Sequence, residues 1–376
     1  MISRRQFTLS TTAVAVAGFN TAQAQSEAKI LLGQSAPLTG PAAQLGIQFN
    51  AGAKVYFDQV NARGGIGRRL IELVAIDDGY EPDRCAENTA KLIAQDPVAL
   101  FGYIGTPTSL AALPLATKER VPFVAPFTGA MSLREPLNKV AFHLRASYDD
   151  ETALIVKQLT NLGLKKIAVF YQNDAYGKAG LSGVTKALAA QGIKPVALAT
   201  VERNSIDVAA AVKTLVAAAP DAIVQVSAYK SCAAFIRAAR AATFGGTFYN
   251  VSFVGTQALS DELGKEAAGV VVSQVVPSPT SLTTALGREF TEAVKTYGKG
   301  ATANYSSLEG YLAARMISEG LRNTAGKISR DALVSGIEAI GNQSYGGFSV
   351  SLSPTDHVAS HFVQLTMLSG DGRVRI

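Results

Sequence analysis

The chain has 376 residues, of which 48% are hydrophobic and 17% are charged, and its formal net charge at pH 7 is +6. This length exceeds what one hydrophobic core usually supports, and the composition is that of a well-packed globular protein, which excludes gross disorder. The positive charge is spread along the chain, and no basic run interleaves with aromatic residues, so we expect no nucleic-acid partner.

The first 24 residues have the pattern of an export signal. Arg4 and Arg5 precede an apolar stretch over 11–19, and Ala22-Gln23-Ala24 supplies the small residues of a cleavage site. The stretch is shorter than the roughly 20 residues that a bilayer-spanning helix needs. The paired arginines followed by Phe7 suggest the twin-arginine route, although Sec export stays open. We therefore expect a periplasmic protein, and the lack of ATP, NADH and reducing glutathione there disfavours most enzymes.

Strand-like and helix-like segments alternate along the mature chain. In the first block we expect strands over 30–35, 70–76, 99–104, 121–125 and 140–145, and helices over 47–63, 82–95 and after residue 104. In the second block we expect helices over 151–162, 179–190, 207–218 and 231–242, and strands over 166–171, 195–201, 222–226, 249–254 and 270–276. Helices near 286–297, 306–323 and 330–340 and strands over 348–352 and 362–368 end the chain.

This alternation predicts the fold class and the division into lobes. Continuous Val, Ile and Ala strands separated by amphipathic helices indicate parallel sheets covered on both faces, and two successive blocks predict two doubly wound α/β lobes. The late elements are too few for a third domain, so they complete the first two. We assign 25–146 and 277–354 to lobe 1 and 147–276 and 355–376 to lobe 2.

The two cysteines, Cys85 and Cys232, fall in different lobes in this layout. A pair of cysteines in an exported chain invites a disulfide interpretation. Both, however, stand near expected helix starts, and a free buried cysteine behaves as a small hydrophobe. We therefore expect two free thiols.

Residues that directly follow strands are the first candidates for a binding site, because ligands of open α/β sheets bind beyond the carboxyl ends of the strands. Gly105 and Thr106 follow the third strand, where Thr106 can cap the next helix and free amides can bind an anion. After the fourth strand, Phe127 offers an apolar wall, Thr128 a hydroxyl and Gly129 a close backbone approach. A well-capped helix and an ordinary turn are the alternatives without a ligand.

In the second lobe, Tyr176 and Tyr229 stand just past strand ends. A tyrosine supplies a flat apolar face and one hydroxyl, which suits a small polar ligand, although either ring can equally pack within its own lobe. Asp149 belongs to the acidic run over 148–151, where the chain changes lobes. This run is most simply a helix cap and first turn, and pairing with a ligand ammonium is the alternative.

Four segments carry a family resemblance: Ala36-Pro37-Leu38-Thr39-Gly40-Pro41, Val60-Asn61-Ala62-Arg63-Gly64-Gly65-Ile66, Asp77-Asp78 and Asn173-Asp174-Ala175-Tyr176-Gly177. In this order and behind an export signal, they resemble the type I periplasmic substrate-binding proteins of ABC transporters, of the leucine/isoleucine/valine-binding kind. The resemblance covers nearly all of the mature chain. It implies a monomeric Venus-flytrap protein whose two lobes, joined by three crossovers, close on one small solute and dock on an inner-membrane permease.

The resemblance also implies roles for the candidate residues. The five lobe 1 positions would hold the carboxylate of the solute, and Tyr176 and Tyr229 would close over it. One position departs from the family: the acid that holds the α-ammonium in amino-acid binders matches Ser252 here. A buried ammonium without a carboxylate partner is costly. Either Asp149 or Asp150 replaces that acid, or the solute is an amide, a urea-like compound or a small carboxylate.

The motifs of common enzyme classes are missing from the sequence. No glycine-rich phosphate loop follows a strand and no nucleophile elbow is present. The three histidines and two cysteines do not have the spacing of a metal site. We therefore expect no enzymatic activity, metal or cofactor, and a ligand-sensing receptor module of the same fold stays open as the alternative to transport.

Overall fold

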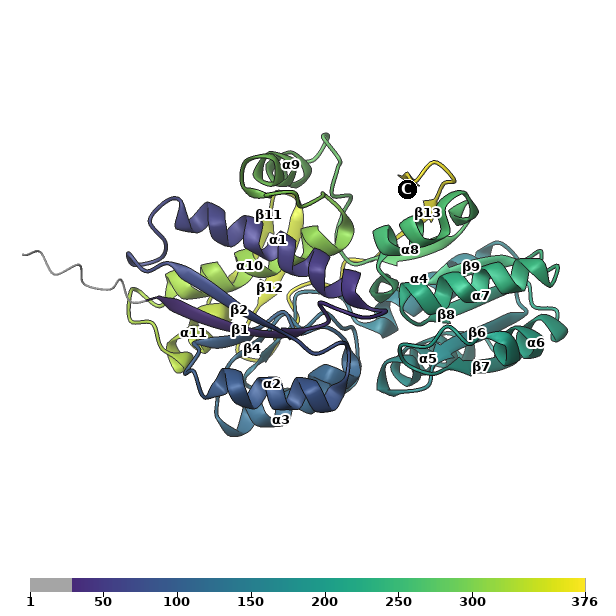
Figure 1. The fold of residues 1–376 in the computed structure, drawn as a ribbon, viewed down its shortest axis with the longest axis horizontal. Helices are drawn as coiled ribbons and strands as arrows, with labels where there is room; N and C mark the ends of the chain where they lie inside the picture. Colours follow the sequence, from purple (N-terminus) through teal and green to yellow (C-terminus); the bar gives the residue numbers. More distant parts are fainter. Residues whose placement is uncertain (1–28, 376) are drawn as a thin grey trace, which may run out of the picture.

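The computed structural model describes residues 29–375, and these form two α/β lobes that lie side by side along the long axis of the molecule (Figure 1). The predicted export signal and its cleavage site lie outside the described residues. None of the helices within 29–375 combines the length and the apolar character needed to cross a membrane.

The first lobe is built on a parallel sheet of five strands in the order β2-β1-β3-β4-β5. The strands are β1 (Ile30–Ala36), β2 (Ile71–Asp77), β3 (Ala99–Phe101), β4 (Phe123–Val124) and β5 (Ala141–Phe142). Helices α1 (Ala43–Asn61), α2 (Pro82–Ile93) and α3 (Thr106–Lys118) connect them, with α2 and α3 on the face of the sheet opposite α1 (Figure 1). All three residues of β3 are buried, as expected for a central parallel strand.

The second lobe contains a sheet of seven strands in the order β14-β13-β10-β9-β8-β6-β7. Its parallel strands are β6 (Ile167–Gln172), β7 (Ala197–Val201), β8 (Ala222–Val226), β9 (Thr247–Asn250) and β10 (Val271–Gln274), and β13 (Gln364–Leu368) and β14 (Val374–Arg375) extend the sheet antiparallel. The helices are α4 (Tyr148–Asn161), α5 (Ala175–Ala189), α6 (Ala209–Ala217), α7 (Tyr229–Ala241) and α8 (Thr256–Leu263). Helix α4 begins with a capping box formed by Ser147 and Asp150, so the acidic run does open a helix.

The late elements lie mostly with the first lobe (Figure 1). They are α9 (Ala285–Tyr297), α10 (Tyr305–Asn323), α11 (Arg330–Glu338) and the hairpin of β11 (Gly341–Tyr345) and β12 (Phe348–Leu352). Helix α10 packs closely on α1. A Cβ atom added at Gly52 of α1 would lie only 1.8 Å from the backbone oxygen of Ser307 in α10, so this contact requires glycine. The chain thus changes lobe after β5, after β10 and after β12, and the predicted fold class is confirmed. The lobe limits that we set within these crossovers stay a prediction.

Some expected elements differ in extent. The strand expected over 249–254 ends at Asn250, and Ser252–Val254 forms a 3-10 turn instead. Both halves of that apolar run are buried, so periodicity alone did not reveal the break. The strand expected over 140–145 is reduced to β5. Helix α8 and strand β11 have no counterpart in the sequence prediction. Cys85 and Cys232 are both free and buried, as expected.

Candidate functional site

The carboxyl ends of β3 and β4 bring Thr106 and Thr128 into contact. Their hydroxyl oxygens lie 2.7 Å apart, and both side chains are fully buried. The two loops are tied together because the backbone N–H of Gly105 donates to the carbonyl oxygen of Phe127 at 3.2 Å. Our expectation that Thr106 caps α3 is wrong. Gly105 is the cap residue and makes no side-chain bond, so the Thr106 hydroxyl is free to face Thr128.

Two tyrosines that the sequence analysis did not select pack against the glycines of these loops. Gly105 has a φ of +94°, and a Cβ there would lie 2.3 Å from the ring of Tyr80. A Cβ at Gly129 would lie 2.6 Å from the backbone nitrogen of Tyr148 and 2.7 Å from its ring. Both positions therefore need glycine, the first for its backbone conformation as well as for space.

An aromatic cluster crosses the boundary between the lobes. Phe253, in the 3-10 turn after β9, has its ring centre 4.5 Å from that of Tyr176, 5.6 Å from Phe127 and 5.9 Å from Tyr80. The rings of Tyr148 and Tyr176 are 5.4 Å apart. The structure thus brings Tyr176 close to the threonine pair, and the Tyr148 hydroxyl, 3.4 Å from that of Thr128, connects the two.

Two other predicted residues lie away from this cluster. Tyr229 is buried at the start of α7, beside the backbone of Gln44 near the start of α1, so it sits at the lobe boundary without touching the threonine pair. Asp149 accepts a hydrogen bond from Lys186 Nζ at 2.8 Å. It lines a separate cavity of about 410 Å³, which also contains His143, near the crossovers. The structure therefore does not bring Asp149 to the threonine pair.

A carboxylate that the sequence analysis missed lies beside Ser252. Glu151 accepts hydrogen bonds from the backbone N–H of Ser252 at 2.7 Å, from its hydroxyl at 3.0 Å and from the hydroxyl of Ser273. Burial raises the pKa of the fully buried Glu151, while the charge of Arg145 and the serine donors oppose that shift. Glu151 belongs to the acidic run that starts α4. The sequence analysis identified this run but interpreted it as a helix cap and first turn.

Two arginine side chains lie beside the loop that carries Phe127 and Thr128. Arg145 forms a bidentate pair with Glu309, with nitrogen–oxygen distances of 2.8 and 2.9 Å, and its guanidinium lies 4.2 Å from the ring centre of Phe127. Burial opposes the charged form, but Glu309 raises the pKa of Arg145 above its usual range. Arg134 donates to the carbonyl oxygen of Thr128 at 3.1 Å. Two buried guanidinium groups thus lie at this end of the cluster, and Glu309 neutralises one of them, that of Arg145.

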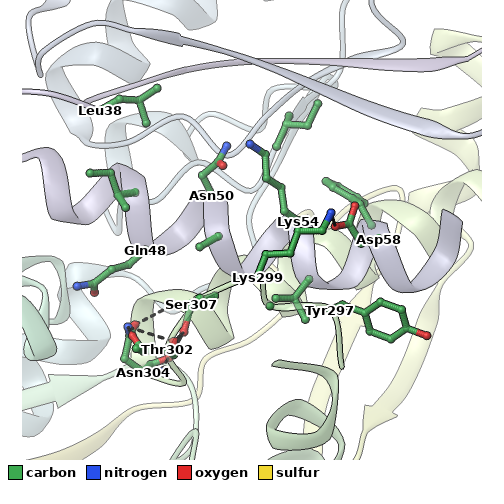
Figure 2. A pocket seen from close by; sticks show the side chains of 18 of the residues that line it. Leu38, Gln48, Asn50, Lys54, Asp58, Tyr297, Lys299, Thr302, Asn304 and Ser307 are labelled. Carbon is green, nitrogen blue, oxygen red and sulfur yellow. Dashed lines mark hydrogen bonds and ion pairs between the residues drawn. The ribbon is translucent and has the colours of Figure 1, made fainter. Parts of the chain in front are cut away.

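A larger hollow lies elsewhere, on the outer side of α1 (Figure 2). This groove of about 1190 Å³ contains none of the predicted site residues. Two of its lysines are paired, Lys299 with Asp58 at 2.8 Å and Lys29 with Glu72 at 2.8 Å, whereas Lys54 makes no ion pair with residues 29–375. Within 29–375, no three or more His, Cys, Asp or Glu side chains are grouped as metal ligands would be.

Two doubly wound lobes connected by three crossovers define the type I class of periplasmic binding protein. The family model described as "Periplasmic binding protein" matches residues 29–373, and the chain belongs to this family, in the leucine/isoleucine/valine-binding branch.

Three known proteins illustrate the similarity. The Leu/Ile/Val-binding protein homolog 7 of Brucella abortus is 27% identical over 334 residues, which cover 84% of this chain and 82% of the relative. A possible leucine/isoleucine/valine-binding protein from Rhodopirellula baltica has a TM-score of 0.87 at 35% identity, covering 92% of this chain and 95% of that chain. A substrate-binding periplasmic protein from Ralstonia solanacearum has a TM-score of 0.87 at 30% identity, covering 92% and 99%.

Proposed function

We propose that this protein is the extracytoplasmic solute-binding component of an ABC uptake system, and that it holds an amino acid between its lobes before delivering it to an inner-membrane permease. The observation that carries this proposal is the buried carboxylate of Glu151 beside Ser252. It replaces the acid that the family pattern has at position 252, so an α-amino acid again becomes the solute that best fits.

The anionic end of the solute is assigned to the threonine pair. Thr106 and Thr128 present two adjacent buried hydroxyls, and the phenol of Tyr148 lies beside them. Burial raises the pKa of Tyr148 to about 12, so the phenol keeps its proton and can donate. The buried charge of Arg134, which has no carboxylate partner among residues 29–375, adds a favourable field for a carboxylate, whereas the charge of Arg145 is compensated by Glu309.

The cationic end is assigned to Glu151. A carboxylate has about four acceptor sites, and the three donors from Ser252 and Ser273 leave capacity for a further N–H. Glu151 follows Tyr148 by about one helical turn, so the two groups lie on the same face of α4. This arrangement suits a solute whose carboxylate and ammonium share one carbon atom.

Transport rather than catalysis is supported by the family membership and by the predicted export signal over residues 1–24. The solute would contact both lobes, so that binding favours the closed form. The closed protein, as a free periplasmic monomer, would then present a surface made by both lobes to the permease.

A calorimetric titration that compares leucine with its des-amino analogue, 4-methylpentanoate, tests the assignment of Glu151. We expect Glu151→Gln to weaken leucine binding by about tenfold to a hundredfold, because a hydrogen bond to a charged group contributes about 1.5–3 kcal/mol. Binding of the des-amino analogue should change little. Asp149→Asn serves as the matched control, since Asp149 pairs with Lys186 outside the cluster. The proposal is wrong if no amino acid binds or if Glu151→Gln binds leucine as the wild type does.

A further inference from the structure

A cavity of about 410 Å³ lies where the two lobes join, apart from the threonine pair and from the groove beside α1. Its walls come from the loop between β4 and β5 in lobe 1, the first crossover at 143–147, the start of α4 in lobe 2 and the third crossover at 355–361. Small-molecule sites occupy roughly 300–1,000 Å³, whereas one water molecule takes up about 30 Å³. The cavity can therefore hold an organic molecule, which would contact both lobes.

Two buried polar atoms of the cavity lining have no hydrogen-bond partner among residues 29–375. They are Nε of Arg134 and Nδ1 of His143, and these residues are only 6% and 2% exposed. An unpaired buried polar group costs a folded protein free energy, and the cost is larger for a charged group. The two atoms are not bonded to each other, and both residues line the cavity, so one group inside it can satisfy both.

The other contacts of these side chains define what each free atom can bind. His143 donates through Nε2 to the carbonyl oxygen of Leu133 at 3.1 Å, because a carbonyl only accepts. Burial lowers the pKa of His143 well below its ordinary value, so the ring is neutral and Nδ1 is an acceptor. Arg134 donates through Nη1 and Nη2 to three backbone carbonyl oxygens, which leaves Nε–H as a donor. A hydroxyl group can accept from Arg134 and donate to His143 at the same time.

The remaining lining favours further hydroxyl groups over a net charge. Four acids line the cavity, and none of them is fully buried: Glu135, Asp149, Asp150 and Asp356. Carboxylates accept hydrogen bonds but do not donate them, so they suit hydroxyl donors and repel an anion, while the charge of Arg134 repels a cation. Met131, Leu133 and Leu137 add an apolar wall, which small-molecule sites commonly have.

We propose that this cavity is a second binding site, and that it holds a small neutral polyhydroxy compound, a sugar or a polyol. One hydroxyl group of the compound bridges Arg134 and His143, and its other hydroxyl groups donate to the carboxylates of the lining. The site is independent of the proposed function, because neither the threonine pair nor Glu151 lines this cavity.

Calorimetric titration of the whole protein with xylitol and with glucose tests the proposal. We expect at least one of them to bind with a dissociation constant below about 1 mM. His143→Gln keeps a donor for the Leu133 carbonyl but removes the Nδ1 acceptor, so it should weaken binding about two- to tenfold. Leu137→Trp places a larger side chain at the half-exposed part of the lining and should weaken binding by at least about tenfold.

A matched control is Leu162→Trp, since Leu162 is an exposed leucine at the end of α4 that does not line this cavity. It should bind as the wild type does, and thermal melting verifies that all three variants fold. The proposal is overturned if neither compound binds, or if His143→Gln and Leu137→Trp both bind like the wild type.

Two further titrations separate this site from others. Tighter binding of acetate or ethanolamine than of both polyhydroxy compounds would overturn the ligand class. Displacement of bound xylitol or glucose by leucine would place the compound in the solute site and overturn the second site. An unchanged leucine affinity of Glu151→Gln, by contrast, contradicts only the proposed function, because Glu151 does not line this cavity.

Discussion

The guanidinium of Arg203 in lobe 2 lies 2.9 Å from the carboxylate of Glu81 in lobe 1. Arg203 also contacts Asp174 at 3.3 Å, and the neighbouring Asn204 donates to Glu81 at 2.8 Å and to the carbonyl oxygen of Gly79 at 3.1 Å. These bonds join the loop that carries Tyr80 to the second lobe. Because they cross from one lobe to the other, they exist only when the lobes are close together, and they therefore favour the closed arrangement.

Breaking this contact is expected to shift the protein toward the open form. Glu81→Gln removes the charge, and because partly exposed ion pairs contribute about 0.2–1 kcal/mol, the closed population should fall by up to about fivefold. Fluorescence energy transfer between labels on the two lobes, measured without solute, reports this shift. High salt should reproduce it in the wild type.

A matched control for this experiment is Glu266→Gln, which breaks the pair with Arg237 inside lobe 2 and should leave the lobe distance unchanged. Identical transfer efficiencies for Glu81→Gln and the wild type would show that the contact does not influence closure.

The threonine pair offers a direct test of the anionic end. Changing Thr106 and Thr128 together to alanine should weaken solute binding by about a hundredfold or more, because each hydrogen bond to a charged group contributes about 1.5–3 kcal/mol. Thr117→Ala is a suitable control, since the Thr117 hydroxyl bonds only within the half-buried part of α3 and to Asn138. Unchanged affinity in the double variant would contradict the assignment.

Alanine substitutions at two glycines with similar φ values distinguish the cost of backbone strain from the cost of a steric clash. Gly105 and Gly64 have φ values of +94° and +90°, but only a Cβ at Gly105 meets a neighbour, the Tyr80 ring at 2.3 Å. We expect Gly64→Ala to cost about 1 kcal/mol of unfolding free energy and Gly105→Ala about 1–3 kcal/mol more. Urea denaturation of both variants measures the difference, and equal losses would contradict the packing argument.

Asp78 gives a specific dependence of stability on pH. Burial raises its pKa from 3.8 to about 6, so the folded chain holds this proton more tightly than the unfolded chain. The contribution of this proton to the free energy of unfolding is fully present below about pH 4 and is lost as the pH rises through 6. A shift of two pKa units corresponds to a loss of about 3 kcal/mol.

Asp78→Asn isolates this contribution, because asparagine does not titrate but keeps both hydrogen bonds. Its amide oxygen can accept from the Tyr80 backbone N–H, and its amide nitrogen can donate to the Ser35 hydroxyl, which lies 2.8 Å from the Asp78 carboxylate in the wild type. The difference in unfolding free energy between variant and wild type should therefore change in favour of the variant between pH 4 and 6.5. A difference that is constant over that interval would contradict the shifted pKa.

The sequence by itself predicted the two-lobe α/β architecture and the neighbouring positions of Thr106 and Thr128. Both predictions rest on local information: buried parallel strands are continuous apolar runs, and the carboxyl ends of adjacent strands meet at one edge of a sheet. The acidic run over 148–151 was equally local and was correctly interpreted as the opening of a helix, although the helix was expected from residue 151 and begins at Tyr148.

Only the tertiary structure decided which acid lies beside Ser252. Asp149 and Glu151 are two residues apart on α4, and positions with that spacing point in widely different directions, so only one can face Ser252. The sequence analysis offered Asp149 or Asp150 as the acid near Ser252, whereas packing against the turn after β9 places Glu151 beside Ser252, 101 positions further along the chain. Tyr80 and the Arg203–Glu81 contact were likewise beyond sequence analysis, because both exist only where the two lobes meet.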